Sequence, residues 1–365
     1  MINVSIAIDH SEQWYNYNFK KINNNYFNKK KYNFCHYNGG STDSYFLTKL
    51  QIYGKKNQIF FDHLRFNKKK SDIVIFINLY RLSPLYKKVL RSNKIFFLII
   101  TEPRVVDPFS YNHKYHKFFK KIFTFDDKLI KKNATLYSYW NGKTWMLKEF
   151  KKIYKKKKSF LSCIFAANRH WLHKDSLSSV RYSIIQWFIN NKPNDLRLFG
   201  SNWNFDYFKI MSVKNYFIRK ALIYLMKFRI FNYFFFKKNL KIYRGEVIDK
   251  VKTASFFKFE FCCENAKNKG RLSERIFQSF FSGTVPIYIG DETIKKYIPR
   301  NCYIDFWKFK NLEQLHKHLQ NMKINTYKKY LKNAEIFIKS KEYFKHTVDY
   351  NAINIIKEIN YLRNN

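Results

Sequence analysis

Short, continuous apolar runs recur along the chain, and they constrain its fold more than any other feature. Two examples are Asp72–Leu79 (D-I-V-I-F-I-N-L) and Lys94–Thr101 (K-I-F-F-L-I-I-T), both rich in β-branched residues. A strand buried on both faces of a parallel sheet has this composition. Between them, Ser83–Ser92 suits a short helix, with Ser83 as its cap and Pro84 in its first position. Strands that alternate with helices predict an α/β sheet.

The same alternation continues through the rest of the chain. Further strands are expected at Ile2–Ile8, Lys121–Phe125, Phe160–Ala166, Asp195–Phe199, Phe256–Cys262 and Val285–Ile289. Helices are expected at Ser176–Asn190 and Ser273–Phe281, and the tail from Leu312 to Leu362 has mostly helical periodicity.

The chain is long enough for two domains. A single hydrophobic core rarely serves 365 residues. The basic stretch Lys148–Lys158 ends in four consecutive lysines and is typical of a solvated link between domains. The sequence therefore predicts one Rossmann-like domain over residues 1–150, a second over 151–340, and a C-terminal helical tail over 341–365.

The charge balance is strongly basic. There are 70 Lys and Arg residues against 26 Asp and Glu, a formal net charge of +44. Such a charge favours a polyanionic partner, namely nucleic acid, an anionic membrane or a phosphorylated substrate. A genome rich in A/T codons would also enrich Lys, Asn, Ile, Tyr and Phe, all abundant here. Both explanations stay open, so only the local placement of charge can support a function.

One basic segment combines aromatic and aliphatic residues with lysines. Tyr216–Lys238 could lie as an amphipathic helix on an anionic membrane, or could turn its apolar face to the core; we favour the core. The chain has no uncharged run of the roughly 20 residues that a membrane span needs. The opening Ile2–Ile8 is too short for a signal peptide. We expect a cytoplasmic protein, or one in peripheral contact with the cytoplasmic membrane face.

The stretch from Phe256 to Asp291 is the richest in chemistry. A strand ends at Cys262-Cys263, and Glu264 and Asn265 follow at the edge where α/β sheets bind ligands. After Gly270 a helix begins, with Glu274 and Arg275 in its first turn. Helix amides and a cation can hold a diphosphate, and a carboxylate can bind sugar hydroxyls. Taken alone, Glu274 and Arg275 could equally be ordinary surface residues.

This stretch resembles the signature of the GDP-fucose-dependent α-1,3/α-1,4-fucosyltransferase family, in its bacterial lipopolysaccharide type. The counterparts of the signature are Lys258-Phe259, Cys263-Glu264-Asn265, Gly270-Arg-Leu-Ser-Glu-Arg-Ile276 and Pro286-Ile-Tyr-Ile-Gly290. Weaker counterparts are Tyr243–Lys250, Tyr297–Phe306, Ala166-Ala-Asn-Arg, Ser179–Ile185, Leu196–Gly200, Thr101-Glu-Pro-Arg and Phe123–Asp127.

The resemblance implies a GT-B fold, with two Rossmann-like domains facing across a cleft. It implies inverting transfer of fucose from GDP-fucose to a hydroxyl of an N-acetylglucosamine-containing glycan, such as that of lipopolysaccharide. The family's catalytic base corresponds to Glu102. Its donor-binding positions correspond to Arg181, Asn265, Arg271, Glu274 and Arg275, with Tyr243 nearby.

Three departures from the family pattern concern the donor more than the reaction. The family's Lys in T-E-K is Arg275 here, its Tyr after Gly is Arg271, and its small residue after the last Gly is Asp291. An arginine keeps the charge for a phosphate but presents a planar fork rather than a point charge.

No essential metal or other cofactor is expected. The acidic pairs Asp126-Asp127 and Asp291-Glu292 do not form a D-x-D motif, and cationic side chains can stabilise the diphosphate. The cysteines Cys35, Cys163, Cys262, Cys263 and Cys302 match no zinc spacing, so free thiols in a reducing compartment are expected.

Three alternatives remain. A GT-B enzyme could use a different nucleotide sugar, and a basic protein with 20% aromatic residues could bind single-stranded nucleic acid. No nucleic-acid-binding motif is present, so we expect no nucleic-acid partner. A catalytically inactive, lectin-like relative is disfavoured because Glu102, Arg181 and Glu274 are all present.

Overall fold

The structure is a computed structural model. It describes residues 1–8, 40–64, 71–79, 84–139, 159–165, 174–201, 203, 213, 215–225, 240–247 and 249–364. The chain forms two compact units. Unit 1 comprises residues 1–149, 268–274 and 340–365, and unit 2 comprises residues 150–267 and 275–339. The predicted linker Lys148–Lys158 lies outside the described residues.

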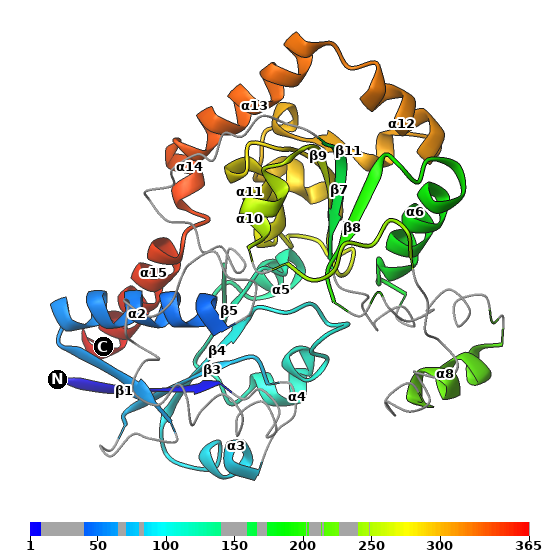
Figure 1. Cartoon of the computed structure of the whole chain (residues 1–365). Coiled ribbons are helices and arrows are strands. Elements are labelled where there is room, and N and C mark those ends of the chain that lie inside the picture. The colour runs from blue at the N-terminus through cyan, green and yellow to red at the C-terminus, as the bar shows by residue number, and fades with distance from the viewer. Residues whose placement is uncertain are drawn as a thin grey trace. The chain divides into compact units, whose positions relative to one another are not determined.

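Unit 1 is built on a six-stranded parallel sheet with the strand order β2-β1-β3-β4-β5-β6 (Figure 1). Its strands are β1 (Ile2–Ile8), β2 (Ile59–His63), β3 (Ile73–Ile77), β4 (Ile95–Ile100), β5 (Lys121–Thr124) and β6 (Tyr137–Tyr139). All five residues of β3 are buried, as a central strand covered on both faces requires.

The helices of unit 1 come from both ends of the chain. They are α2 (Gly40–Lys56), α3 (Pro84–Val89), η2 (Phe109–Tyr111), α4 (His113–His116), α5 (Asp127–Lys132), α14 (Lys341–Phe344) and α15 (Val348–Asn364). On one face of the sheet, Ile355 and Ile359 of α15 join Val4, Ile75 and Phe97 in a single core. The C-terminal helix therefore completes the N-terminal unit.

Polar contacts fix α15 beside α2. The Asp349 carboxylate accepts a hydrogen bond from the Tyr53 hydroxyl at 2.7 Å and pairs with the Lys49 ammonium at 2.7 Å. Near the carboxyl ends of both helices, Asn360 Nδ2 donates to Asn57 Oδ1 at 2.9 Å. Figure 1 shows the two helices side by side.

Unit 2 has a five-stranded parallel sheet with the order β11-β10-β9-β7-β8. The strands are β7 (Ser159–Ile164), β8 (Leu196–Phe199), β9 (Phe257–Cys263), β10 (Val285–Ile289) and β11 (Ile304–Asp305). Its helices are α6 (Ser178–Asn191), α8 (Tyr216–Leu225), α10 (Lys250–Ala254), α11 (Glu274–Phe281), η3 (Glu292–Lys296), η4 (Arg300–Cys302), η5 (Phe306–Lys308), α12 (Leu312–Gln320) and α13 (Ile324–Ile338).

The predicted α/β alternation is confirmed, and the predicted strands and helices match observed ones to within about two residues at most ends. The structure adds α2, β2, β6, α10 and β11, which the sequence patterns did not predict. Ser83, the predicted cap of α3, lies outside the described residues.

The core placement expected for Tyr216–Lys238 is confirmed only in part where the structure describes the segment. Helix α8 exposes Phe217 by 78%, Ile218 by 54% and Tyr224 by 59%, while Leu222 packs against the core of unit 2. Among the described side chains of α8, Leu222 therefore meets the core, whereas Phe217, Ile218 and Tyr224 stay in solvent. Residues 226–239 lie outside the described part. Among the residues that the structure does describe, no helix combines the length and the apolar character of a membrane span.

The α15 packing generates a stability prediction. Ile355→Ala should lower the free energy of unfolding by about 2–5 kcal/mol, because it removes a fully buried side chain and leaves a cavity. Ile336→Ala is the matched control, since Ile336 lies on a helix but is 58% exposed. Chemical denaturation monitored by circular dichroism measures both. Equal effects would contradict the role of α15 in the core of unit 1.

Candidate active site

The sheet of unit 2 has a topological switch point between β7 and β9. The chain leaves β7 toward β8 on one side, whereas β9, β10 and β11 extend to the other side. Ligands of open α/β sheets bind at the carboxyl ends of the strands at such a point. Helix α6 lies between β7 and β8 in sequence, and α11 follows β9.

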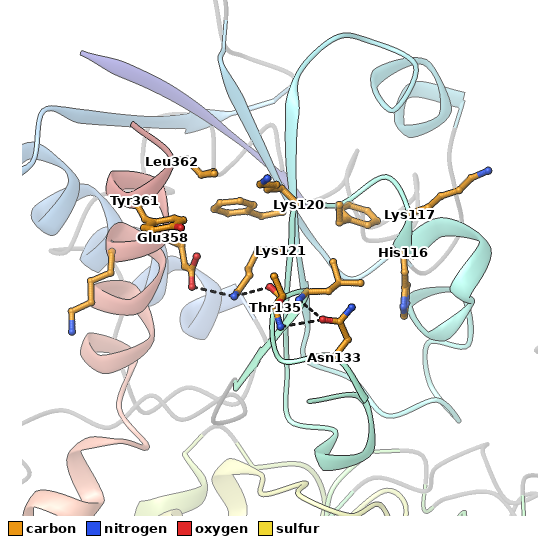
Figure 2. Close-up of a pocket in the computed structure, with 13 residues that line it drawn as sticks. His116, Lys117, Lys120, Lys121, Asn133, Thr135, Glu358, Tyr361 and Leu362 are labelled. Atoms are coloured by element: carbon orange, nitrogen blue, oxygen red, sulfur yellow. Dashed lines mark hydrogen bonds and ion pairs between the residues drawn. The ribbon is translucent and has the colours of Figure 1, made fainter. Parts of the chain in front are cut away.

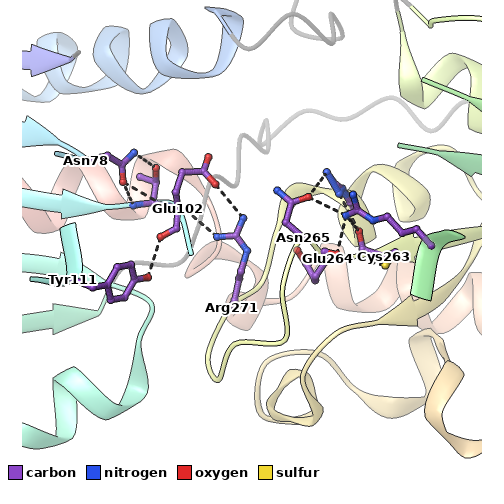
Figure 3. A network of polar contacts seen from close by, with 10 residues as sticks. Asn78, Glu102, Tyr111, Cys263, Glu264, Asn265 and Arg271 are labelled. Atoms are coloured by element: carbon purple, nitrogen blue, oxygen red, sulfur yellow. Dashed lines mark hydrogen bonds and ion pairs between the residues drawn. The ribbon is translucent and has the colours of Figure 1, made fainter. Parts of the chain in front are cut away.

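Arg181 of α6 is buried at this point, with 1% of its surface exposed. Its Nη2 donates to the carbonyl oxygens of Cys263 and Glu264, each at 2.8 Å, and to Asn265 Oδ1 at 2.9 Å (Figure 3). The guanidinium lies 4.9 Å from the ring centre of Phe165. Arg181 thus holds the turn that follows β9.

A second arginine reaches the same acceptors. Arg275 of α11 donates from Nη1 to the Cys263 carbonyl at 3.0 Å and from Nη2 to Asn265 Oδ1 at 3.4 Å. Burial lowers the pKa of Arg181, and the positive charge of Arg275 lowers it further, while Glu264 has a smaller opposite effect. Nε and Nη1 of Arg181 have no hydrogen-bond partner among the described residues.

This arrangement suits an anionic ligand. Buried charges are normally paired, and two adjacent guanidinium groups repel each other. Here both donate hydrogen bonds to the Cys263 carbonyl and to Asn265 Oδ1, which brings the two positive charges together. The first turn of α11 adds backbone amides and the positive end of a helix dipole. An anion near Arg275 and Asn265 would offset the repulsion.

In unit 1, Glu102 follows the carboxyl end of β4 and is held by its neighbours. Asn78, directly after β3, accepts hydrogen bonds at Oδ1 from the amides of Thr101, at 2.8 Å, and Glu102, at 3.3 Å. Its Nδ2 donates to Thr101 Oγ1 at 2.7 Å. The Tyr111 hydroxyl donates to the Glu102 carbonyl at 2.9 Å, and burial raises the Tyr111 pKa, so the donor stays protonated.

The backbone of Asn78 has a φ of +56°, in the left-handed region that is uncommon for residues with a side chain. Such a conformation persists only where the surroundings over-determine it, and it often occurs at functional sites. The three hydrogen bonds to residues 101 and 102 supply that constraint.

Arg271 meets the carboxylate of Glu102. Its Nη2 lies 3.6 Å from Glu102 Oε2, its Nη1 donates to the Thr101 carbonyl at 3.2 Å, and its guanidinium lies 5.3 Å from the Phe125 ring centre. The preceding Gly270 has a φ of +79°, and a Cβ there would come 2.1 Å from the Phe125 carbonyl oxygen. Only glycine lets the backbone approach β5 this closely, and the approach positions Arg271.

The structure divides the predicted site residues into two groups. Arg181, Asn265 and Arg275 meet in unit 2, whereas Glu102 and Arg271 meet in unit 1. Glu274 is the first residue of α11. The Tyr243 hydroxyl donates to the Gly200 carbonyl at 2.8 Å, just past the carboxyl end of β8. The family resemblance assigned Arg271 to the donor site, but the guanidinium of Arg271 contacts the Glu102 carboxylate.

Two residues that hold Glu102 were missed by the sequence analysis. The predicted strand Asp72–Leu79 includes Asn78, and a polar amide at the end of an apolar run could have indicated a functional position. Tyr111 gave no local signal, because its contact with Glu102 depends on the turn at Phe109–Tyr111.

The acidic pairs and the cysteines have structural explanations. Asp126 caps α5 by accepting from the Lys128 amide at 2.9 Å, and Asp291 caps η3 by accepting from the Thr293 amide at 3.0 Å. The described residues contain no group of three or more side chains that could hold a metal ion. Burial raises the pKa of the Cys163, Cys262 and Cys263 thiols, which disfavours a thiolate nucleophile at these positions.

Comparison with known proteins first gives the class. A solved DNA-modifying β-glucosyltransferase, studied with and without uridine diphosphoglucose, aligns with 98% of this chain and 100% of its own at a TM-score of 0.53 and 12% identity. Together with the two parallel sheets, this similarity defines a GT-B glycosyltransferase fold. A solved α1,3-fucosyltransferase with GDP-fucose covers 90% of this chain and 81% of its own, with a TM-score of 0.49 and 16% identity.

The family follows from the sequence comparison. Residues 199–364 match the C-terminal model of glycosyltransferase family 10 (fucosyltransferase). An α-(1,3)-fucosyltransferase of Helicobacter pylori is 32% identical over 68 residues, which are 19% of this chain. The matched stretch spans 14% of that relative's length. The predicted family resemblance is confirmed.

The contacts of Arg181 generate a second stability prediction. Arg181→Met should destabilise the protein by about 3 kcal/mol, because buried oxygens of Cys263, Glu264 and Asn265 lose a charged donor. The control is Arg244→Met, since Arg244 is exposed and bonds only to nearby carbonyls in the described structure. Urea denaturation measures both variants. A loss below about 1 kcal/mol for Arg181→Met would contradict the structural role.

Proposed function

We propose that this protein is an inverting fucosyltransferase that moves fucose from GDP-fucose to a hydroxyl of an N-acetylglucosamine-containing glycan. The observation that carries the proposal is the convergence of Arg181 and Arg275 on Asn265 at the switch point of unit 2. Arg275, Asn265 and this strand–loop–helix segment lie within the family-matched residues 199–364.

The donor's diphosphate is the anion that fits this arrangement. Arg275 and the first amides of α11 bind the phosphates, and Asn265 presents its amide beside them. Arg181 is buried against the turn that follows β9. Its hydrogen bond orients Asn265, and its guanidinium adds positive charge to the site. Glu274, the first residue of α11, accepts hydrogen bonds from ribose or fucose hydroxyls.

In the reaction, the acceptor oxygen forms a bond to the anomeric carbon of fucose as the bond to the GDP oxygen breaks. Glu102 takes the proton of the attacking hydroxyl. The transition state has oxocarbenium character, and the cations stabilise the charge that develops on the leaving diphosphate. We propose that no metal ion takes part, since Arg181 and Arg275 supply positive charge in a fixed position.

Within unit 1, Arg271 and Asn78 position the base. Asn78 and Tyr111 fix the backbone of Glu102, and Arg271 holds its carboxylate. We therefore propose that Arg271 is a positioning residue for the base.

A second nucleotide sugar is the main alternative, because Arg271 and Arg275 replace a Tyr and a Lys of the family pattern. The net charge of +44 also keeps a nucleic-acid partner as an outcome to be tested. The acceptor we propose is a lipopolysaccharide-type glycan. We further propose peripheral contact with an anionic membrane through the exposed stripe of α8, which carries Phe217, Ile218 and Tyr224.

Donor binding gives the first functional prediction. In calorimetry with EDTA present throughout, the wild-type protein should bind GDP and GDP-fucose. It should bind UDP-galactose far more weakly. Arg275→Met should weaken GDP binding about 10- to 100-fold, because it removes a charged contact worth about 1.5–3 kcal/mol. Arg300→Met, a change at an exposed arginine of η4, is the control. Absence of guanine-nucleotide binding would refute the fucosyltransferase proposal.

The catalytic side gives the second functional prediction. With an N-acetylglucosamine-containing disaccharide as acceptor, Glu102→Gln should lower kcat at least about 100-fold and leave GDP-fucose affinity unchanged, because only the base is lost. Arg271→Gln should lower kcat about tenfold, again with unchanged GDP affinity. A tenfold loss of GDP affinity in Arg271→Gln would instead place this side chain on the donor, as the sequence motif indicated.

Membrane contact gives the third functional prediction. Wild type should sediment with phosphatidylglycerol vesicles, and Phe217→Ser/Ile218→Ser should reduce the bound fraction severalfold by removing apolar surface. The matched control is Ile324→Ser/Ile336→Ser, which changes two exposed isoleucines of α13. Equal losses in the two double variants would exclude α8 as the contact surface.

A further inference from the structure

Unit 1 contains a cavity of about 860 Å³ (Figure 2). None of the residues that line it takes part in the proposed reaction. It lies at the amino ends of β5 and β6, beside the last turns of α15. Glu102 follows the carboxyl end of β4, so the two sites lie at opposite edges of the same sheet. The lining residues are Phe97, His116, Lys117, Phe119, Lys120, Lys121, Asn133, Thr135, Leu136, Lys357, Glu358, Tyr361 and Leu362.

The lining is strongly cationic. Four lysines face one carboxylate, that of Glu358. Lys121 is already engaged, because its ammonium lies 3.4 Å from Glu358 Oε1 and donates to the Thr135 carbonyl at 2.9 Å. Within the described part of the chain, Lys117, Lys120 and Lys357 have no ion pair to a carboxylate. These three are exposed. The Lys117 ammonium lies 5.4 Å from the ring centre of Phe118 and points away from Lys121 (Figure 2), so it must turn to reach a ligand in the cavity.

His116 adds no charge to this set. Both its ring nitrogens are already hydrogen-bonded, Nδ1 with the Tyr137 hydroxyl and Nε2 with the Ser110 carbonyl, each at 2.8 Å. Burial lowers its pKa, and nearby cations, including His113 when protonated, Arg104 and Lys132, lower it further. His116 is therefore neutral near pH 7 and forms part of the floor.

Apart from the polar Asn133 and Thr135, the remaining walls are apolar or aromatic. Phe97 and Phe119 are buried, Leu136 and Leu362 are half-buried, and Tyr361 is 64% exposed. Apolar walls exclude water from one side of a bound anion and strengthen its attraction to the lysines. An amphipathic ring at the rim offers a flat surface for the C–H face of a sugar. The cavity combines the two features that a charged saccharide requires.

We propose that this cavity is a binding site for a phosphate-bearing saccharide, separate from the donor site. Lys117, Lys120 and Lys357 bind the phosphate as mobile point charges, and Tyr361 packs on the sugar ring. The choice of a saccharide rests on the proposed function, whereas the preference for an anion rests only on the lining. Such a site would hold a charged part of a glycan acceptor at a distance from the reacting hydroxyl.

The test measures binding of mannose 6-phosphate, mannose and inorganic phosphate to the full chain by calorimetry at about 0.05 M salt, where charge screening is weak. Lys117→Ser/Lys120→Ser/Lys357→Ser should weaken mannose 6-phosphate binding about tenfold. The matched control is Lys328→Ser/Lys329→Ser/Lys332→Ser, which removes the same charge from exposed lysines of α13. This control should change the affinity for mannose 6-phosphate less than twofold. Equal losses in both triple variants would overturn the proposal, because net charge alone would explain them.

Two further variants test the geometry. Glu358→Gln removes the one carboxylate of the lining and should strengthen mannose 6-phosphate binding two- to fivefold, whereas a purely structural role predicts no gain. Tyr361→Ala should weaken mannose 6-phosphate but leave inorganic phosphate unchanged. Equal effects on both probes would refute a sugar site.

GDP binding, measured in the same variants, separates this proposal from the proposed reaction. GDP affinity should stay unchanged in every cavity variant. Retained mannose 6-phosphate binding in a protein that binds no guanine nucleotide would refute the fucosyltransferase proposal and leave the cavity site standing. If single-stranded oligonucleotide displaced mannose 6-phosphate at equal phosphate concentration, the ligand of this cavity would be nucleic acid and the saccharide proposal would be refuted.

Discussion

A parallel strand presents apolar side chains on both faces, and both units depend on covering those faces. The requirement is most visible in unit 1, where β3 is fully buried. One face of the sheet is covered by α15, which follows most of unit 2 in the sequence. The first unit is therefore incomplete until the last helix is present. The contacts of Asp349 with Tyr53 and Lys49 fix where that helix lies.

The same sheets decide where chemistry can occur. Parallel strands all end at one edge, and polar groups that follow the strands gather there. In unit 2 the edge gathers two guanidinium groups on the turn after β9, and in unit 1 it gathers Asn78, Glu102 and Arg271. In both units, side chains that bind a backbone turn sit beside the groups assigned to the reaction. In the reaction that we propose, positioning and catalysis are thus shared between neighbouring residues.

The net charge of +44 gains meaning only from its placement. Many lysines lie on exposed helix faces, where pairs such as Lys317 with Glu313 contribute little stability. The buried Arg181 and the lysines around the cavity at α15 differ, because apolar surroundings on one side strengthen their attraction for an anion. Basic composition and the local anion sites that we propose are therefore separate features, whatever the origin of the lysine excess.

The amino-acid sequence by itself determined the fold class, because continuous apolar runs with period-matched helices between them leave few alternatives to a parallel α/β sheet. It also placed Asn265, Glu274 and Arg275 on one strand–loop–helix segment, since their spacing is local. The tertiary structure alone decided that Arg271 contacts Glu102, that Asn78 and Tyr111 hold that residue, and that α8 exposes Phe217, Ile218 and Tyr224. The contacts of Arg271 with Thr101 and Glu102 join residues as much as 170 positions apart, and a contact at that separation depends on strand order and helix docking, which no local pattern encodes.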